Sequence, residues 1–175
     1  MKFNIIACIN DKLCLGKEQK LIYDIKDDLT NFKRMTIGQV VIMGRKTLES
    51  LPNGQPLSNR INIIITNDRH FGEDKTDEWP CYAVKVVHSV DEAISLCESL
   101  YKDKECFVIG GAMIFSQFLA RNIVDKMYLT EVADSYCGDT FFPNVFENWR
   151  IWYQSPFGTT ANNLKYRFTI YAPRF

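Results

Sequence analysis

The sequence has few of the residues on which metal sites and covalent active sites depend. It contains two histidines, His70 and His88, and neither stands in a recognisable motif. Its six cysteines include no C-x-x-C pair and do not cluster with the histidines. These absences disfavour a metal site and a mechanism that needs a nucleophile activated by a neighbouring base.

The sequence also has no excess of one charge and no long apolar run. The 21 basic residues balance the 21 acidic ones, which gives no support to nucleic-acid or membrane binding. The N-terminal stretch contains neither a membrane-spanning run nor a signal-peptide cleavage site. Cys8, Cys97 and Cys106 lie in apolar runs, where a free thiol packs as a small hydrophobic group. We therefore expect a protein of the reducing cytoplasm.

What the sequence does contain is an alternation of apolar strands and helical periods. The expected strands cover residues 3–9, 40–43, 61–66, 82–87, 106–110, 126–132, 149–154 and 164–172. Helical patterns cover about 24–35, the stretch after the Ser89–Glu92 capping box, and the stretch after Gly111. This order predicts one α/β domain over residues 1–175, with a mainly parallel sheet covered on both faces. The last two strands are expected to form an antiparallel hairpin.

Two of the expected strands end at glycine and lead directly into a helical pattern. The first turn lies at Gly44, and the second at Gly110 and Gly111. A helix start presents free N–H groups that suit an anion, and glycine lets the backbone approach a ligand closely. Each turn alone is a weak signal, because α/β proteins also use such turns only for packing. Two turns of different type, with Arg45 and Thr47 beyond the first, favour a ligand with two or more phosphates, such as a dinucleotide.

The segment between the first strand and the first helix, residues 10–23, has no clear periodicity. Loops of this length inside a compact domain are commonly lids over an active site. The alternative is a surface loop of variable sequence with no such role. We expect a lid.

The expected first helix carries one acidic residue on the border of its apolar face. At about 100° per residue, Ile25, Leu29 and Phe32 share one face, whereas Asp27 points to solvent. Asp28 falls at the edge of the apolar stripe, where burial should raise the pKa of its carboxyl group. It is either an edge residue satisfied by solvent or a basic neighbour, or a receptor for paired N–H donors such as a pterin ring. Beside a dinucleotide, the second interpretation favours hydride transfer, in which the cofactor carries the difficult chemistry.

Several motifs resemble those of the dihydrofolate reductase family. They are VIMGRKTLES, SVDEAI, VIGGAMIFSQFL, MYLTEV and GDTFFP, in the order and spacing of that family and across essentially the whole chain. The resemblance implies a single-domain fold with an eight-stranded, mostly parallel sheet, an antiparallel C-terminal strand and about four helices. It also implies NADPH-dependent reduction of 7,8-dihydrofolate to 5,6,7,8-tetrahydrofolate, by a monomer that folate-analogue inhibitors bind.

By residue match, the resemblance implies a substrate site. Asp28 would bind the 2-amino and N3 edge of the pterin and promote protonation of N5, and Thr130 would donate a hydrogen bond to it. Arg60 would clamp the glutamate tail with its bidentate guanidinium. Leu21 and Tyr23 of the lid would belong to the catalytic group. The remaining substrate contacts, through backbone carbonyls or apolar walls, would be Ile6, Leu29, Phe32, Leu51, Leu57, Ile109 and Phe115.

The same matches imply an NADPH site at the two glycine turns. The second turn is where the family carries a cis Gly–Gly bond. Arg45 and Arg69 would favour the 2′-phosphate of NADPH over NADH. The expected cofactor contacts are Ala7, Cys8, Leu15, Gly16, Gln19, Gly44, Arg45, Lys46, Thr47, Ile65, Thr66, Asn67, Arg69, Ile109, Gly110, Gly111, Ala112, Met113, Ile114 and Phe115.

Several positions depart from the family pattern. Ile22-Tyr23 stands where the family usually has Pro-Trp, and Lys26 where it usually has proline. The tryptophan normally steadies a water near the acid, so Tyr23 either does this through its hydroxyl or does not do it. Met113 replaces a basic residue of some members, which predicts weaker contacts to the adenosine phosphate. His88, at an adenine-edge position, is interpreted as an ordinary surface residue.

Two other functions stay open at this point. A pyrimidine reductase of riboflavin synthesis shares the general fold, although Arg60 and the helix with Asp28 argue against it. A catalytically silent protein that binds pterin or nucleotide would keep both ligand sites and show no NADPH oxidation. An assay with dihydrofolate separates each of them from a dihydrofolate reductase.

Overall fold

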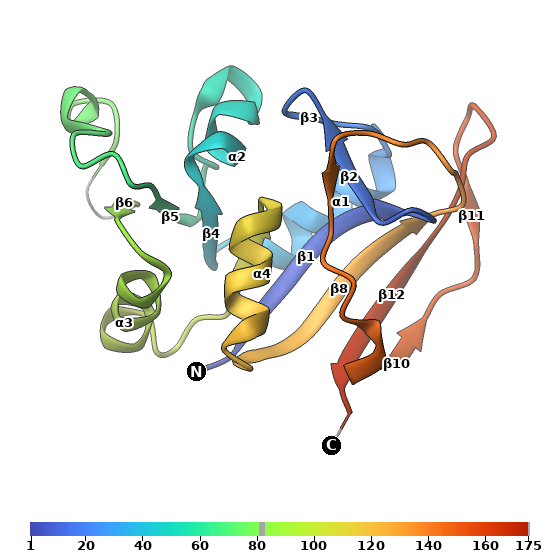
Figure 1. Cartoon of the computed structure of the whole chain (residues 1–175). Coiled ribbons are helices and arrows are strands. Elements are labelled where there is room, and N and C mark those ends of the chain that lie inside the picture. Colours follow the sequence, from blue (N-terminus) through green and yellow to red (C-terminus); the bar gives the residue numbers. More distant parts are fainter. Residues whose placement is uncertain (81–82, 175) are drawn as a thin grey trace.

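The computed structural model describes residues 1–80 and 83–174, which are built around one large sheet (Figure 1). Among these residues a nine-stranded sheet has the order β10-β12-β8-β1-β7-β4-β5-β6, with β11 paired to β12. Its strands are β1 Phe3–Asn10, β4 Val40–Gly44, β5 Ile61–Ile65, β6 Val84–Val87, β7 Cys106–Gly110, β8 Val124–Val132, β10 Trp149–Gln154, β11 Gly158–Thr159 and β12 Lys165–Pro173. Pairs from β8 to β6 are parallel, whereas β12 is antiparallel to β8 and β10. The predicted α/β class and mainly parallel sheet are confirmed.

The helices cover both faces of this sheet. They are α1 Lys26–Thr36, α2 Arg45–Ser50, α3 Val90–Leu100 and α4 Ala112–Ala120, with 3-10 turns η1 Pro52–Gly54, η2 Glu73–Lys75 and η3 Phe146–Asn148. In Figure 1, α3 and α4 lie in front of the sheet and α1 lies behind it. The first expected helix starts later than predicted, at Lys26, because the preceding residue Ile25 is extended and buried.

Strand β4 shows why its run of apolar residues is continuous. Val40 and Ile42 pack into the core cluster that contains residues of α3 and α4. Val41 and Met43 pack into a second cluster with Leu48 of α2 on the other face. Because successive side chains of a strand point to opposite faces, a strand buried on both sides must be apolar throughout.

Helix α3 begins at the expected cap, with one displacement. Ser89 Oγ accepts a hydrogen bond from Glu92 N at 3.0 Å. The Glu92 carboxylate accepts from His88 N at 2.8 Å, whereas a capping box would direct it to the N–H of Ser89. The predicted cap is therefore correct for Ser89, whereas Glu92 accepts from the N–H one residue before the expected one.

The C-terminal part of the sheet also follows the prediction. Strands β10 and β12 pair antiparallel, and β12 lies between β10 and β8. The strand predicted at residues 82–87 begins at Val84 in the structure, and Tyr82 lies outside the described residues. Cys81 does too, and the other five cysteines are free thiols.

The expectation that residues 10–23 lack regular structure is wrong in part. They contain β2 Cys14–Lys17 and β3 Lys20–Leu21, which join β9 Thr140–Phe141 in a small sheet of order β3-β2-β9. These strands are too short to show a period, and β9 is far away in the sequence. Within the described ranges, no helix is long and apolar enough to cross a membrane, and no cluster of His, Cys, Asp and Glu could hold a metal ion.

Candidate functional site

The two glycine turns lie side by side at the ends of neighbouring parallel strands. Met43 of β4 is paired with Gly110 of β7, so both strands end at the same edge of the sheet. Strand β4 leads into α2 after Gly44, and β7 leads into α4 after Gly111. A Cβ added at Gly110 would lie 3.3 Å from Thr47 Oγ1, which shows how closely α2 approaches the second turn. This edge of a parallel sheet is where nucleotide ligands bind in α/β folds.

The second turn has the backbone that the resemblance implied. The bond between Gly110 and Gly111 is cis. Gly110 has a φ of 131°, which side-chain-bearing residues rarely adopt. Glycine at this position therefore has a conformational reason, independent of any ligand.

Asp28, on the first turn of α1, reaches across to strand β8. Its Oδ1 accepts a hydrogen bond of 2.5 Å from Thr130 Oγ1, and Thr130 is only 3% exposed. The β1–β8 register places Thr130 opposite Cys8, so the carboxylate lies over the middle of the sheet. Burial raises the pKa of Asp28, and the hydrogen bond from Thr130 partly offsets this rise. The expected hydrogen bond and pKa direction are both present, and a half-buried acid of this kind is typical of functional sites.

Cys8 is the titratable neighbour of this acid. Burial, and then the charge of Asp28, raise the pKa of the Cys8 thiol. The thiol therefore stays protonated at physiological pH and adds no second negative charge beside Asp28. It is partly buried and packs against the cluster that contains Ile25 and Val132.

Arg60 directly precedes β5 and lies beside the C-terminal end of α1. Its Nε donates to Ser58 O at 2.9 Å, and its Nη1 donates to Thr36 Oγ1 at 3.1 Å. The guanidinium also lies over the ring of Phe32, 5.9 Å from its centroid. Partial burial lowers the pKa of Arg60, which nevertheless stays charged. A cation held on two sides in this way is pre-oriented for a carboxylate.

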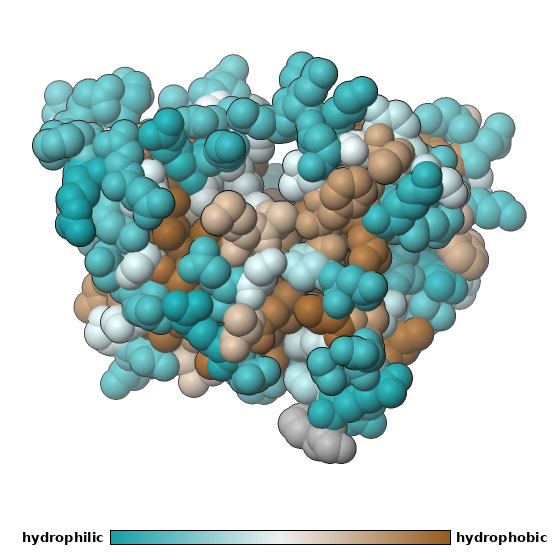
Figure 2. Space-filling view, in the orientation of Figure 1, coloured by the Kyte–Doolittle hydropathy of each residue, from teal (hydrophilic) through white to brown (hydrophobic). Residues whose placement is uncertain are grey.

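Two cavities are present in the described part of the chain, and only the smaller one is lined by α2. The larger, of about 550 Å³, lies at the starts of β5 and β6 and is lined by Leu57, Arg60 and Trp79 among others. Another of about 450 Å³ is lined by Arg45 and Asp68. Asp28 lines neither of these, and Figure 2 shows a recess between α2 and the β2–β3 hairpin, bordered by weakly polar and apolar residues. The smaller cavity borders the first glycine turn, whereas the larger one lies at the opposite ends of the strands.

Arg45 is paired with acids on both sides. Its Nε lies 2.9 Å from Glu49 Oε1, and its Nη1 lies 3.1 Å from Asp68 Oδ2. Its guanidinium also lies over the ring of Phe71. All of these side chains are partly exposed, so an incoming anion could compete for Arg45. The expected 2′-phosphate contact therefore has to be made beside Asp68.

The lid segment is tied to the loop that follows β8. Asp139 Oδ2 accepts from Glu18 N at 2.9 Å, and Asp139 N donates to Gly16 O at 3.1 Å. A Cβ added at Gly138 would collide with the Gly16 carbonyl oxygen and lie 2.7 Å from Cys14 Sγ. Only glycine permits this approach. These contacts hold the β2–β3 hairpin beside the recess.

Tyr23 lies at the end of the lid, two residues before the buried Ile25. Its hydroxyl donates to Asp134 Oδ2 at 2.5 Å and accepts from Asn10 Nδ2 at 3.0 Å. Burial and the bond to Asp134 raise the pKa of Tyr23, so the phenol remains protonated. The hydroxyl therefore makes its protein hydrogen bonds to Asn10 and Asp134 rather than to Asp28.

Comparison with known proteins identifies the family in which this geometry occurs. A family model described as dihydrofolate reductase matches residues 2–173. The chain belongs to the dihydrofolate reductase family. The dihydrofolate reductase of Staphylococcus haemolyticus is 33% identical over 173 residues, which cover 98% of this chain and 95% of that relative. The dihydrofolate reductase of Staphylococcus aureus (strain Mu50 / ATCC 700699) is 32% identical over 152 residues, 86% of this chain and 84% of that relative.

A solved structure agrees with this assignment. Dihydrofolate reductase from Enterococcus faecalis, complexed with NADP(H) and RAB-propyl, superposes with a TM-score of 0.82 at 25% sequence identity. The match covers 99% of this chain and 97% of that chain. The resemblance to dihydrofolate reductases that the motifs indicated is thus confirmed over the whole chain.

Two apolar residues differ in exposure from what the sequence suggested. Leu29, expected on the buried stripe of α1, is 48% exposed, which suits the wall of an open cleft but not the core. Phe115, expected as a wall of the substrate site, is 1% exposed and packs on the ring of Phe142. Its ring also lies against the second glycine turn, since a Cβ added at Gly110 would lie 3.6 Å from Phe115 Cζ. Its contact with the substrate stays a prediction.

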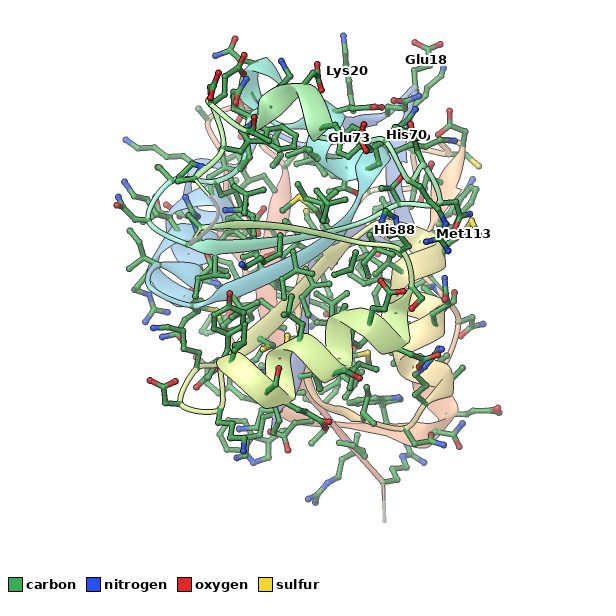
Figure 3. All side chains as sticks on the ribbon, turned by 90° about the vertical axis from the view of Figure 1, so that its left-hand side faces the viewer. Glu18, Lys20, His70, Glu73, His88 and Met113 are labelled. Atoms are coloured by element: carbon green, nitrogen blue, oxygen red, sulfur yellow. The ribbon has the colours of Figure 1, made fainter. Side chains whose placement is uncertain are left out.

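His88 and Met113, both expected near the adenosine, differ in exposure. His88 is half-buried, and its Nδ1 lies 2.9 Å from Thr66 O, so it is not an ordinary surface residue. Met113 is 77% exposed at the start of α4. Figure 3 shows His88 and Met113 along the same side of the molecule as the His70–Glu73 pair.

The other predicted contacts differ in their burial. Buried or half-buried in the described structure are Ile6, Ala7, Leu15, Gly16, Thr47, Leu51, Leu57, Ile65, Thr66, Ile109, Gly110, Gly111, Ala112 and Ile114. Exposed are Gln19, Leu21, Lys46, Asn67 and Arg69. Sequence reasoning missed Asn10, Asp68 and Asp134. The position of Asp68, directly after the predicted contacts Thr66 and Asn67, was a signal that could have identified it. Asn10 and Asp134 had no such signal, because their hydrogen-bond partners are distant in sequence.

Proposed function

We propose that the protein catalyses the NADPH-dependent reduction of 7,8-dihydrofolate to 5,6,7,8-tetrahydrofolate for one-carbon metabolism. The observation that carries the proposal is the half-buried Asp28, held by Thr130 beside the two glycine turns. Membership of the dihydrofolate reductase family supports the same reaction. One acid without a nucleophile suits hydride transfer, in which the protein binds, orients and supplies charge.

The residues at the glycine turns fit NADPH. Gly110 lets the two turns approach each other closely, because an added Cβ would lie 3.3 Å from Thr47 Oγ1. Arg45 is the cation for the 2′-phosphate, together with Arg69, which follows Asp68, the partner of Arg45. NADPH, when bound, supplies the hydride that reaches C6 of the pterin. The proposed cofactor contacts are Ala7, Cys8, Leu15, Gly16, Gln19, Gly44, Arg45, Lys46, Thr47, Ile65, Thr66, Asn67, Arg69, Ile109, Gly110, Gly111, Ala112, Met113 and Ile114.

Asp28 is the proposed catalytic residue. Its free carboxylate oxygen binds the amino and ring N–H edge of the pterin, while Thr130 fixes the other oxygen. Its raised pKa favours a proton on or near the carboxyl group, which passes through water to N5. The walls and carbonyls around the ring are proposed to be Ile6, Leu29, Phe32, Leu51, Leu57 and Ile109.

Arg60 is the proposed clamp for the glutamate tail. It borders the larger cavity, and its two hydrogen bonds to protein set the direction of the guanidinium. Folate-analogue inhibitors that keep the ring donors and the tail would use the same contacts.

The lid, residues 10–23, closes over the reacting centre with Leu21 and Tyr23. The protein acts as a monomer in the cytoplasm.

The test is the loss of absorbance of NADPH in the presence of dihydrofolate. The proposal predicts oxidation of NADPH that depends on dihydrofolate and is stopped by a folate-analogue inhibitor. Binding of both ligands without oxidation would instead identify a silent binding protein.

A further inference from the structure

Two hydrogen bonds join the same two segments of the chain. Tyr23 donates to Asp134 and Thr130 donates to Asp28, each at 2.5 Å. Residues 23 and 28 flank the start of α1, and residues 130 and 134 flank the end of β8. Ile25 is buried between them against Val132. The helix start is therefore held at both ends against one strand and the loop that follows it.

A buried amide completes this arrangement. Asn10 is 3% exposed, and its Nδ2 donates both to Tyr23 Oη at 3.0 Å and to Tyr136 O at 2.7 Å. Its Oδ1 accepts from Lys12 N and Cys14 N, each at 3.0 Å. One side chain thus fixes the first turn of the lid, the end of the lid and the loop after β8. Such a fully used buried amide holds its neighbours in one arrangement.

The direction of the bond between Tyr23 and Asp134 is defined by their charges. The hydrogen bond from Tyr23 holds the pKa of Asp134 below its ordinary value, so the carboxylate is ionised at neutral pH. The phenol keeps its proton and donates it, while Asn10 supplies the other contact of the same oxygen. A charged acceptor makes such a bond stronger than a neutral one would be.

We propose that Asp134 is a positioning residue for the reaction: through Tyr23 and Asn10 it fixes the junction of the lid and α1, and so the placement of Asp28. Ile25, three residues before Asp28, is buried and packs against Val132, so Tyr23 and the first turn of α1 are held as one unit against the end of β8. This inference rests on the proposed function, since it concerns the rate of that reaction. The tyrosine hydroxyl is thereby used for anchoring.

The test compares Tyr23→Phe, Asp134→Asn and the double variant, with Asp125→Asn as control at the other end of β8. Single-turnover hydride transfer is measured against pH, together with the dissociation constant of NADPH by fluorescence and the unfolding temperature. We expect each single variant to slow hydride transfer about tenfold, because small misplacements near a reacting centre are costly. The double variant should be no slower than the singles, because both remove the same bond.

Two further readouts separate positioning from general stability. If Asp28 loses its fixed contact with Thr130, the pKa that governs hydride transfer rises, whereas the NADPH dissociation constant stays within about twofold. Asp134→Glu, which keeps the charge, should recover part of the rate if Asp134→Asn folds poorly. Rates within twofold of wild type in both single variants, additive losses, or a lower unfolding temperature with an unchanged pH profile would each overturn the inference. Absence of dihydrofolate-dependent turnover in the wild-type protein would instead overturn the proposed function.

Discussion

At the scale of single residues, the carboxylate of Asp28 combines a cost in stability with a use in catalysis. Replacement by Asn keeps the shape and the acceptor for Thr130 but removes the charge and the titratable proton. We expect Asp28→Asn to lower turnover at pH 7 by at least about a hundredfold, the usual contribution of a positioned acid or base. NADPH binding, measured by fluorescence, should be retained. Unchanged turnover would contradict the role of Asp28.

The same substitution should stabilise the fold at neutral pH. The pKa of Asp28 is raised in the folded protein above its ordinary value of 3.8, so folding disfavours the ionised form. Stability is therefore lost as the pH rises through the folded-state pKa. Chemical denaturation should show Asp28→Asn to be more stable than wild type at pH 7, with the difference vanishing below about pH 3.8. A less stable variant at pH 7 would mean that the charge is compensated in the folded state.

Asp68 should limit the preference for NADPH over NADH. Its carboxylate lies against Arg45, and a 2′-phosphate at that cation would meet a repulsion of about 1 kcal/mol per unit charge in water. We expect Asp68→Asn to tighten NADPH binding by roughly fivefold to tenfold and to leave NADH binding unchanged. Titration of both cofactors, with Asp103→Asn as the control, measures this. Equal changes for the two cofactors would exclude a contact at the 2′ position.

Arg60 should discriminate between substrates by their tails. Arg60→Leu removes the guanidinium next to the larger cavity, and loss of a charged hydrogen bond costs about 1.5–3 kcal/mol, or roughly tenfold to a hundredfold in affinity. Dihydrofolate should lose this affinity, and a pterin without a glutamate tail should keep its own. Arg34→Leu on the exposed side of α1 is the control. Equal losses for the two ligands would count against the clamp.

At the scale of elements, the lid hairpin is built on an unfavourable turn. Strands β2 and β3 are joined by Glu18 and Gln19, which both have positive φ values, 50° and 62°. Two-residue hairpins favour Asn-Gly at such positions, because these residues adopt positive φ readily. Replacing the pair by Asn-Gly should raise the free energy of unfolding by about 1 kcal/mol, measured by denaturation. A loss of stability would show that the side chains of Glu18 and Gln19 make contacts worth more than the relieved strain.

Strands that are buried on both faces of the sheet could be predicted from the sequence. Strands whose pairing partner is distant in the sequence could not. The apolar runs VVIM and INIII predicted β4 and β5 correctly, because a parallel strand between two layers is apolar throughout. The lid strands were missed because their partner β9 lies more than a hundred residues away. The bond between Tyr23 and Asp134, 111 residues apart, leaves no local pattern. For Asp28 the local pattern was sufficient, because helical geometry alone placed it at the border of the apolar face.

At the scale of the whole molecule, the cofactor should stabilise the fold in proportion to its binding. The glycine turns join β4, β7, α2 and α4, so a ligand seated there contacts several elements that unfolding would separate. NADPH at about a hundred times its dissociation constant adds about 2.7 kcal/mol, or roughly 5–10 °C in unfolding temperature. Asp28→Asn should show the same shift. Absence of a shift in a protein that is otherwise folded would contradict the cofactor site.

The strand order has a consequence during synthesis. Strand β12 is inserted between β8 and β10, although the ribosome makes it after both. Until it emerges, the outer edge of β8 has no partner, and the strand that carries Thr130 is exposed to pairing with other nascent chains. A pause in translation just before residue 165 would prolong that interval, so chaperone association in the cell should be greatest there.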